Sequence, residues 1–246
     1  MSKYVISIDI GTTGTRAIAF SKDLKIIAKS YYELNQFYPK PSWVEQNPKQ
    51  IWELTFKALS DVINTIGIDK VECIGITNQR ETKILWDKKT SEPVYNAITW
   101  QCRRTEEICK ELKKYKNLIK QKTGLNLDPY FSATKIKWIL DNIELAKTKY
   151  DKNELIFGTV DTWILYNLTK GKSHYTEPTI ASRTLLFNIH TLQYDQELLN
   201  IFNIKENILP LIKQTSDFFG YLDKSYLWKR NSNNRNNRRS TSFTIS

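Results

Sequence analysis

Ile8-Asp9-Ile10-Gly11-Thr12-Thr13-Gly14-Thr15-Arg16 joins a run of β-branched residues to a turn made of glycines and threonines. The β-branched run is typical of a strand. Gly11 and Gly14 permit positive φ angles and a close approach of the backbone to a ligand. The stretch therefore predicts a strand followed by a tight turn. The two readings of that turn are a phosphate site and an ordinary hairpin, for which Gly and Thr are also suited.

The side chains of this turn favour the phosphate site. Backbone N–H groups and the hydroxyls of Thr12, Thr13 and Thr15 can point at anionic oxygens. Asp9 ends the strand as a carboxylate that can hold magnesium directly or through water. Arg16 offers a planar guanidinium for phosphate. The pattern is neither a Walker A loop nor GxGxxG, so it does not by itself identify a nucleotide-binding family.

The segments that follow predict a layered α/β domain. Residues 16–21 and 25–34 read as second and third antiparallel strands of a meander. Asn47-Pro48 is typical of a helix start, and apolar residues at helical spacing predict a helix over 48–66. Two short apolar runs, 71–77 and 82–86, predict further strands, so that strands and helices alternate.

Three more helices are expected in the second half of the chain. An apolar stripe within a Lys- and Glu-rich segment predicts a surface helix over 103–122 that ends at Gly124. Another is expected over 134–147, and a third after Asp161.

Composition excludes several classes of protein. The chain of 246 residues is 40% hydrophobic and 12% aromatic, which is enough for a core. Its net charge is +11, but residues 229–246 contribute five basic side chains and no acidic one, which leaves +6 for the rest. This mild excess suits an enzyme that handles phosphates as well as a nucleic-acid binder. The Asn- and Arg-rich end carries no nucleic-acid motif, so no specific nucleic-acid partner is expected.

The same composition predicts a soluble, cytoplasmic protein without a disulfide framework. Cys73, Cys102 and Cys109 form no CxxC pair, and reduced thiols that pack as small apolar side chains are expected. No segment approaches 18 apolar residues, so no membrane span is predicted.

Several blocks together carry a resemblance to a known family. They are Gly75-Ile76-Thr77-Asn78-Gln79-Arg80-Glu81-Thr82, Tyr95 to Arg104, Asp128 to Trp138, Phe157 to Trp163 and Ala181 to Thr184. With the opening turn, this set resembles the FGGY carbohydrate kinases, and within that family those that act on glycerol. The resemblance covers residues 3–220 in order. The spacing of Tyr130, Ser132, Lys135, Trp138, Asp141 and Asn142 also fits the first signature of the family.

The resemblance implies an actin/Hsp70-like ATPase fold of the ribonuclease H-like type, in which two α/β domains close on ATP and Mg²⁺. It implies that Thr12, Thr13, Gly14 and Arg16 meet the phosphates of ATP. It places Asp9 at the metal and in the catalytic centre. Where this chain has Gly14, family members commonly have serine, so one hydroxyl of the loop is missing here.

The substrate residues that the resemblance implies are Arg80, Glu81, Trp100 and Tyr130. Their chemistry suits a triol: a carboxylate accepts hydrogen bonds from neighbouring hydroxyls, the guanidinium donates, and the indole covers the C–H face. Taken singly, Arg80 and Glu81 also read as a loop ion pair, and the two aromatic residues as core. The implied reaction transfers the γ-phosphate of ATP to glycerol and gives sn-glycerol 3-phosphate; the family also allows a homo-oligomer.

One missing motif leads us to expect an incomplete kinase. The Gly-Asp-Gln motif whose aspartate accepts the hydroxyl proton in the family does not occur here. We therefore expect residues 1–221 to form the first of the family's two domains and 222–246 to be a divergent, disordered basic tail. An absent second domain, from a frameshift or an early stop, would leave the chain with little turnover alone. Another FGGY polyol or sugar kinase and a non-catalytic ligand-binding fragment are the alternatives.

Overall fold

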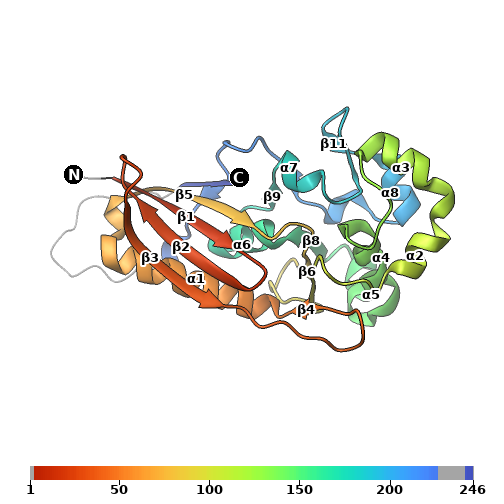
Figure 1. Cartoon of the computed structure of the whole chain (residues 1–246), viewed down its shortest axis with the longest axis horizontal. Coiled ribbons are helices and arrows are strands. Elements are labelled where there is room, and N and C mark those ends of the chain that lie inside the picture. Colours follow the sequence, from red (N-terminus) through yellow and green to blue (C-terminus); the bar gives the residue numbers. More distant parts are fainter. Residues whose placement is uncertain (1–2, 227–241, 246) are drawn as a thin grey trace.

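The computed structural model describes residues 3–226 and 242–245 (Figure 1). A six-stranded sheet lies at one end of the molecule, and α2, α3 and α8 lie at the other (Figure 1). The strands are β1 (Tyr4–Ile10), β2 (Gly14–Phe20), β3 (Ile26–Glu33), β4 (Glu45–Gln46), β5 (Val71–Asn78), β6 (Lys83–Asp87), β7 (Ala97–Ile98), β8 (Leu155–Thr159), β9 (Tyr175–Thr176), β10 (Phe187–Asn188), β11 (Gln193–Tyr194), β12 (Leu211–Ile212), β13 (Gly220–Tyr221) and β14 (Ser242–Ile245). The helices are α1 (Pro48–Ile66), α2 (Glu106–Glu111), α3 (Lys116–Thr123), α4 (Ser132–Asn142), α5 (Glu144–Asp151), α6 (Val160–Leu168), α7 (Pro178–Ala181) and α8 (Gln196–Phe202), with 3₁₀ turns η1 (Ile68–Lys70), η2 (Lys113–Tyr115), η3 (Glu206–Ile208) and η4 (Lys224–Tyr226).

The predicted meander is confirmed. β1 pairs antiparallel with β2, and β2 with β3, while β5 adds parallel to the other edge of β1. Alternate residues of β1 (Ile6, Ile8 and Ile10) are fully buried on one face. Asp9, near the end of β1, lies on the opposite face, which is the less buried face of the sheet.

Helix α1 covers the buried face of this sheet and has the predicted bounds. Asn47 caps it by accepting hydrogen bonds from the N–H groups of Lys49 and Gln50, and Gly67 ends it at φ 87°. The hydroxyls of Thr55 on α1 and Thr15 on β2 are 2.9 Å apart inside the core. The predicted apolar stripe of α1 therefore packs against the sheet that carries the glycine-threonine turn.

The second sheet, in the order β4-β7-β6-β8, lies between two hydrophobic cores. Ile84 and Trp86 of β6 pack into the core shared with α1 and α6, whereas Leu85 packs with α4 and α5 on the other side. All five residues of β6 are buried. This double burial also places Lys83, at the start of β6, in the interior.

Two of the predicted helices are each broken in two. The segment 103–122 forms α2 and α3 with a 3₁₀ turn between them, and 134–147 forms parts of α4 and α5. Ile143 interrupts the second pair with an extended backbone, and this bend turns Ala146 and Tyr150 back onto the core that α4 also covers. Gly124 ends α3 in the left-handed conformation, as predicted.

Packing contacts continue past residue 221, into the start of the segment predicted as a tail. Leu222 is buried, and the ring of Tyr226 packs 4.8 Å from that of Phe56 and 5.8 Å from that of Trp52. Residues 242–245 form β14, which pairs with β5. Apolar contacts with α1 thus extend the packed chain to Tyr226, and the rest of the predicted tail, 227–241 and 246, lies outside the described residues.

Two further expectations concern cysteines and membranes. Cys73, Cys102 and Cys109 are free thiols, as predicted. Within 3–226 and 242–245, no helix combines the length and the apolar character that crossing a bilayer requires.

Candidate functional site

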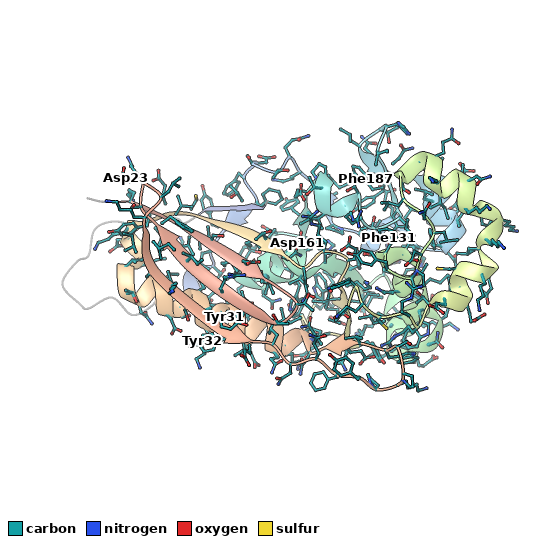
Figure 2. The ribbon with its side chains drawn as sticks, in the orientation of Figure 1. Asp23, Tyr31, Tyr32, Phe131, Asp161 and Phe187 are labelled. Carbon is teal, nitrogen blue, oxygen red and sulfur yellow. The ribbon has the colours of Figure 1, made fainter. Side chains whose placement is uncertain are left out.

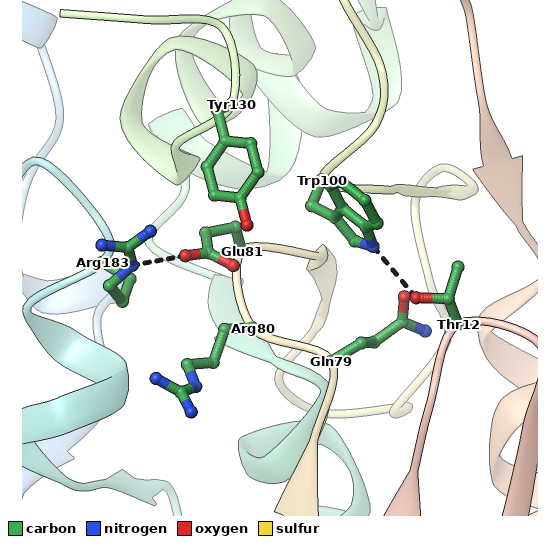
Figure 3. Close-up of a pocket in the computed structure, with 7 residues that line it drawn as sticks. All are labelled: Thr12, Gln79, Arg80, Glu81, Trp100, Tyr130 and Arg183. Atoms are coloured by element: carbon green, nitrogen blue, oxygen red, sulfur yellow. Dashed lines mark hydrogen bonds and ion pairs between the residues drawn. The ribbon is translucent and has the colours of Figure 1, made fainter. Parts of the chain in front are cut away.

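A pocket of about 240 Å³ lies where the ends of β1 and β5 meet the loops before α2 and α4. Four predicted residues meet in it: Arg80, Glu81, Trp100 and Tyr130. The full lining is Thr12, Gln79, Arg80, Glu81, Trp100, Tyr130 and Arg183 (Figure 3). These residues come from five separate turns, so the sheet and its loops bring them together. The pocket has the size and mixed polarity of a site for a small polar ligand.

Glu81 is the anionic centre of the pocket. Its residue surface is only 3% exposed, and its carboxylate accepts a 2.5 Å hydrogen bond from Arg183 Nε (Figure 3). Its backbone has a φ of 61°, which residues other than glycine rarely adopt. Such backbone conformations recur at functional sites. The turn after β5 thus holds a buried, ion-paired carboxylate in an unusual backbone position.

The alternative reading of Arg80 and Glu81 as a loop ion pair is wrong. Arg80 is exposed and makes no ion pair in the part of the chain that the structure describes. Arg183, 102 residues further along, neutralises Glu81 instead. Consecutive residues of a turn point in different directions, which leaves the Arg80 guanidinium free at the pocket edge.

Trp100 and Tyr130 form the aromatic wall. Their ring centroids are 5.6 Å apart, and the Arg183 guanidinium lies 5.7 Å from the Tyr130 ring. The buried Lys135 Nζ donates to the carbonyls of Trp100 (3.3 Å), Tyr130 (3.0 Å) and Thr99 (2.8 Å). One ammonium group therefore fixes the backbone of both aromatic residues, and its burial lowers the pKa of Lys135 to about 8.

The phosphate-loop candidates occupy the adjoining turn. The Gly11 N–H donates to the Gly14 carbonyl at 2.8 Å, which closes the turn. Trp100 Nε1 donates to the Thr12 hydroxyl at 2.9 Å (Figure 3). Thr12 thus forms part of the pocket wall, while Thr13 is exposed.

Asp9 and Arg16 face each other across β1 and β2. Arg16 Nε lies 2.8 Å from Asp9 Oδ2, and the two side chains are 54% and 35% exposed. The two residues form one charged pair beside the glycine-threonine turn.

A chain of amide hydrogen bonds links the phosphate loop to the pocket. Gln46 Nε2 donates to the Thr12 carbonyl at 2.8 Å, and Gln79 Nε2 donates to Gln46 Oε1 at 2.7 Å. The Thr82 hydroxyl donates to Gln79 Oε1 at 3.1 Å. These contacts hold the turns after β1 and β5 in a defined relative position.

Sequence reasoning missed two lining residues, Gln79 and Arg183. Both lie inside the blocks that carried the family resemblance, so the signal was present. Neither has a spacing that marks it as a ligand-binding residue, because the pairing of Arg183 with Glu81 exists only in the fold.

Few side chains near the turn after β1 could bind a metal ion. The described residues contain no group of three or more His, Cys, Asp or Glu that could hold a metal ion. Mg²⁺ commonly uses one or two carboxylates together with substrate phosphates and water. Asp9 fits that mode, as one carboxylate that completes the coordination of an ion brought by a nucleotide.

The sequence matches a family model and curated relatives. The model of the FGGY family of carbohydrate kinases, N-terminal domain, matches residues 4–230. A glycerol kinase from Aquifex aeolicus is 58% identical over 221 residues, which are 90% of this chain and 45% of that protein. A glycerol kinase from Caldanaerobacter subterraneus is 52% identical over 229 residues, 92% of this chain and 46% of that protein.

Solved structures share the fold. Plasmodium falciparum glycerol kinase with ADP superposes with a TM-score of 0.87 at 38% identity, covering 92% of this chain and 46% of that one. Gluconate kinase from Lactobacillus acidophilus gives a TM-score of 0.82 at 26% identity over 92% of this chain and 45% of that one. The chain spans about half the length of the relatives it matches.

Proposed function

The chain belongs to the FGGY family of carbohydrate kinases, and on that premise we propose that it binds glycerol and the phosphates of ATP for transfer of the γ-phosphate to glycerol. The observation that carries the proposal is the pocket in which the buried Glu81–Arg183 pair faces Trp100 and Tyr130. A carboxylate and a guanidinium on one side and aromatic rings on the other match alternating hydroxyl and C–H surfaces of a small polyol.

In the proposed complex, the Glu81 carboxylate accepts hydrogen bonds from two hydroxyls of glycerol. The free guanidinium of Arg80 donates to a hydroxyl from the pocket edge, and Trp100 covers the carbon chain. The Tyr130 hydroxyl supplies a further contact. Because Glu81 and Arg183 are already paired, the site presents fixed partners and needs little reorganisation on binding.

The proposed phosphate site is the turn from Gly11 to Thr15. The hydroxyl of Thr13 and N–H groups of the turn other than that of Gly11, which donates to Gly14, face the phosphates, and the Arg16 guanidinium adds positive charge. Asp9 would hold Mg²⁺, which enters with ATP and neutralises charge between the phosphates. This arrangement positions the two substrates side by side, since Thr12 belongs to both the loop and the pocket.

The proposal gives this chain binding and positioning roles. Phosphoryl transfer also needs a group that accepts the hydroxyl proton. None of the residues given a role above is proposed to accept it. A cytoplasmic location belongs to the proposal, since three free thiols suit a reducing compartment. A homo-oligomer stays a prediction.

Isothermal titration calorimetry with a ligand panel tests the proposal. Glycerol should bind the purified chain more tightly than propane-1,2-diol, because a missing hydroxyl leaves buried polar groups unpaired. Gluconate and xylulose are included as ligands of other sugar kinases. Tighter binding of gluconate or xylulose would assign the site to another kinase of the family. An ATP-dependent glycerol phosphorylation assay on the same sample should show little or no turnover; rapid turnover would place a proton acceptor within this chain.

Thr12→Val should weaken glycerol binding by about five- to tenfold, because a neutral hydrogen bond contributes about 1 kcal/mol. Valine keeps the shape but removes the acceptor that fixes Trp100 Nε1. The measurement is the dissociation constant for glycerol, with Thr65→Val as the control, because Thr65 is an exposed residue near the end of α1. Equal affinity in the parent and Thr12→Val would show that this hydrogen bond does not position the indole.

A further inference from the structure

Tyr31 lies over the glycine-threonine turn. A Cβ built on Gly14 would stand 2.5 Å from Cζ and Cε2 of Tyr31 and closer still to its hydroxyl. The end of the phenol ring therefore occupies the space that a side chain at position 14 would need. Glycine at this position and tyrosine at position 31 are a matched pair, as in the cross-strand covering of a glycine by an aromatic ring.

Strand register places Tyr31 in a row with the charged pair of the loop. Asp9 is the partner of Arg16 across β1 and β2, and Arg16 is the partner of Tyr31 across β2 and β3. All three side chains lie on the face of the sheet that α1 does not cover. Tyr32 is the next residue on β3 (Figure 2). It points the other way and donates to Asp61 of α1 at 2.6 Å.

The Tyr31 hydroxyl is available to a ligand. The residue is 53% exposed, and its hydroxyl makes no hydrogen bond within 3–226 and 242–245. It stands over Gly14 of the turn, and Tyr31 is the cross-strand partner of Arg16. A neutral O–H donor at such a place adds a hydrogen bond to an anion without adding charge.

We propose that Tyr31 is a phosphate-binding residue of this loop: its hydroxyl donates to a phosphate oxygen of ATP at the place where a side chain of residue 14 would otherwise stand. The inference rests on the proposed function and adds a residue from outside the loop itself. Glu33 lies opposite Gly14 on the same face, but a carboxylate offers no donor to an anion. Lys29, the other donor on this face of β3, lies opposite Ile18, two residues further from the turn than Tyr31. Tyr31 is thus the donor of β3 nearest to the turn.

Calorimetric titration with magnesium tripolyphosphate tests the proposal, because this probe needs only the phosphate loop. Tyr31→Phe should weaken its binding by about five- to tenfold and leave glycerol binding within twofold of the parent. The double variant Gly14→Ser with Tyr31→Ala should recover an affinity within about threefold of the parent, since the serine hydroxyl then fills the vacated space. Tyr32→Phe is the matched control; it should lower the melting temperature and leave tripolyphosphate binding unchanged.

Several titration results would contradict the role proposed for Tyr31. Unchanged tripolyphosphate affinity in Tyr31→Phe would overturn it, as would a parallel loss of glycerol binding, which would indicate a structural role only. If the parent chain binds glycerol but no tripolyphosphate, the inference fails and the polyol site stands. If the parent binds neither, both the inference and the proposed function fail.

Discussion

Glu81→Gln is expected to weaken glycerol binding by about 100-fold or more. Each tenfold in affinity is about 1.4 kcal/mol, and hydrogen bonds to a charged group contribute about 1.5–3 kcal/mol each. Glutamine keeps the size of the side chain but loses one acceptor and the negative charge. It also leaves the Arg183 guanidinium beside a neutral amide in a largely buried position. Calorimetry with glycerol measures the effect.

The control is Glu107→Gln, which removes a charge from an exposed pair with Lys110 on α2. That variant should bind glycerol as the parent does. Circular dichroism should show the same fold in all three proteins, because Glu81→Gln changes no side-chain volume. A loss of less than threefold in Glu81→Gln would mean that the polyol is recognised elsewhere on the chain.

The sequence predicted those elements of the fold that short-range patterns specify. The helix over Pro48–Ile66 has a capping residue, an N-terminal proline, one apolar stripe and a terminal glycine, and its predicted bounds are the observed ones. The break at Ile143 was missed because both halves carry apolar residues at helical spacing. What bends the chain there is the position of the core beneath it, which local periodicity does not contain.

The candidate site shows the same division. The residue types of the pocket were predicted from the blocks, and Arg80, Glu81, Trp100 and Tyr130 do meet in space. The alternative reading of Arg80 and Glu81 as an ion pair was wrong, because adjacency in sequence suggested a contact that Arg183 makes instead. The roles of these residues stay predictions. That they line one pocket shows that they are close together, and it does not show that they bind a ligand.

Two buried lysines lie behind the pocket. Lys83 and Lys135 are both fully buried, and they interact with each other. Lys135 bonds three carbonyl oxygens, whereas Lys83 Nζ has no hydrogen-bond partner among the described residues. Burial and the neighbouring Lys135 charge lower the pKa of Lys83 well below its usual value. An amine in this position lowers the stability of the fold. In the unfolded chain it is a hydrated ammonium group, and folding removes that hydration or the proton.

Lys83→Met should therefore raise the free energy of unfolding by about 2 kcal/mol or more at pH 7, in line with replacements of buried charged groups by apolar ones. Methionine fills similar volume without an amine. The gain should shrink as the pH rises from 7 to 10. A pKa that is lower in the folded than in the unfolded state makes the parent more stable with rising pH, because the unfolded state then holds more protons. Urea unfolding at pH 7 and pH 9.5 measures both effects.

The exposed Lys113 supplies the control for general charge effects. Lys113→Met should change the free energy of unfolding by less than about 0.5 kcal/mol at either pH, as is usual for surface positions. Glycerol binding should survive in Lys83→Met, since Lys83 does not line the pocket and Lys135 still holds Trp100 and Tyr130. A destabilised Lys83→Met would show instead that the amine makes a favourable contact. The candidate for that contact is the Glu81 carboxylate, whose charge raises the pKa of Lys83.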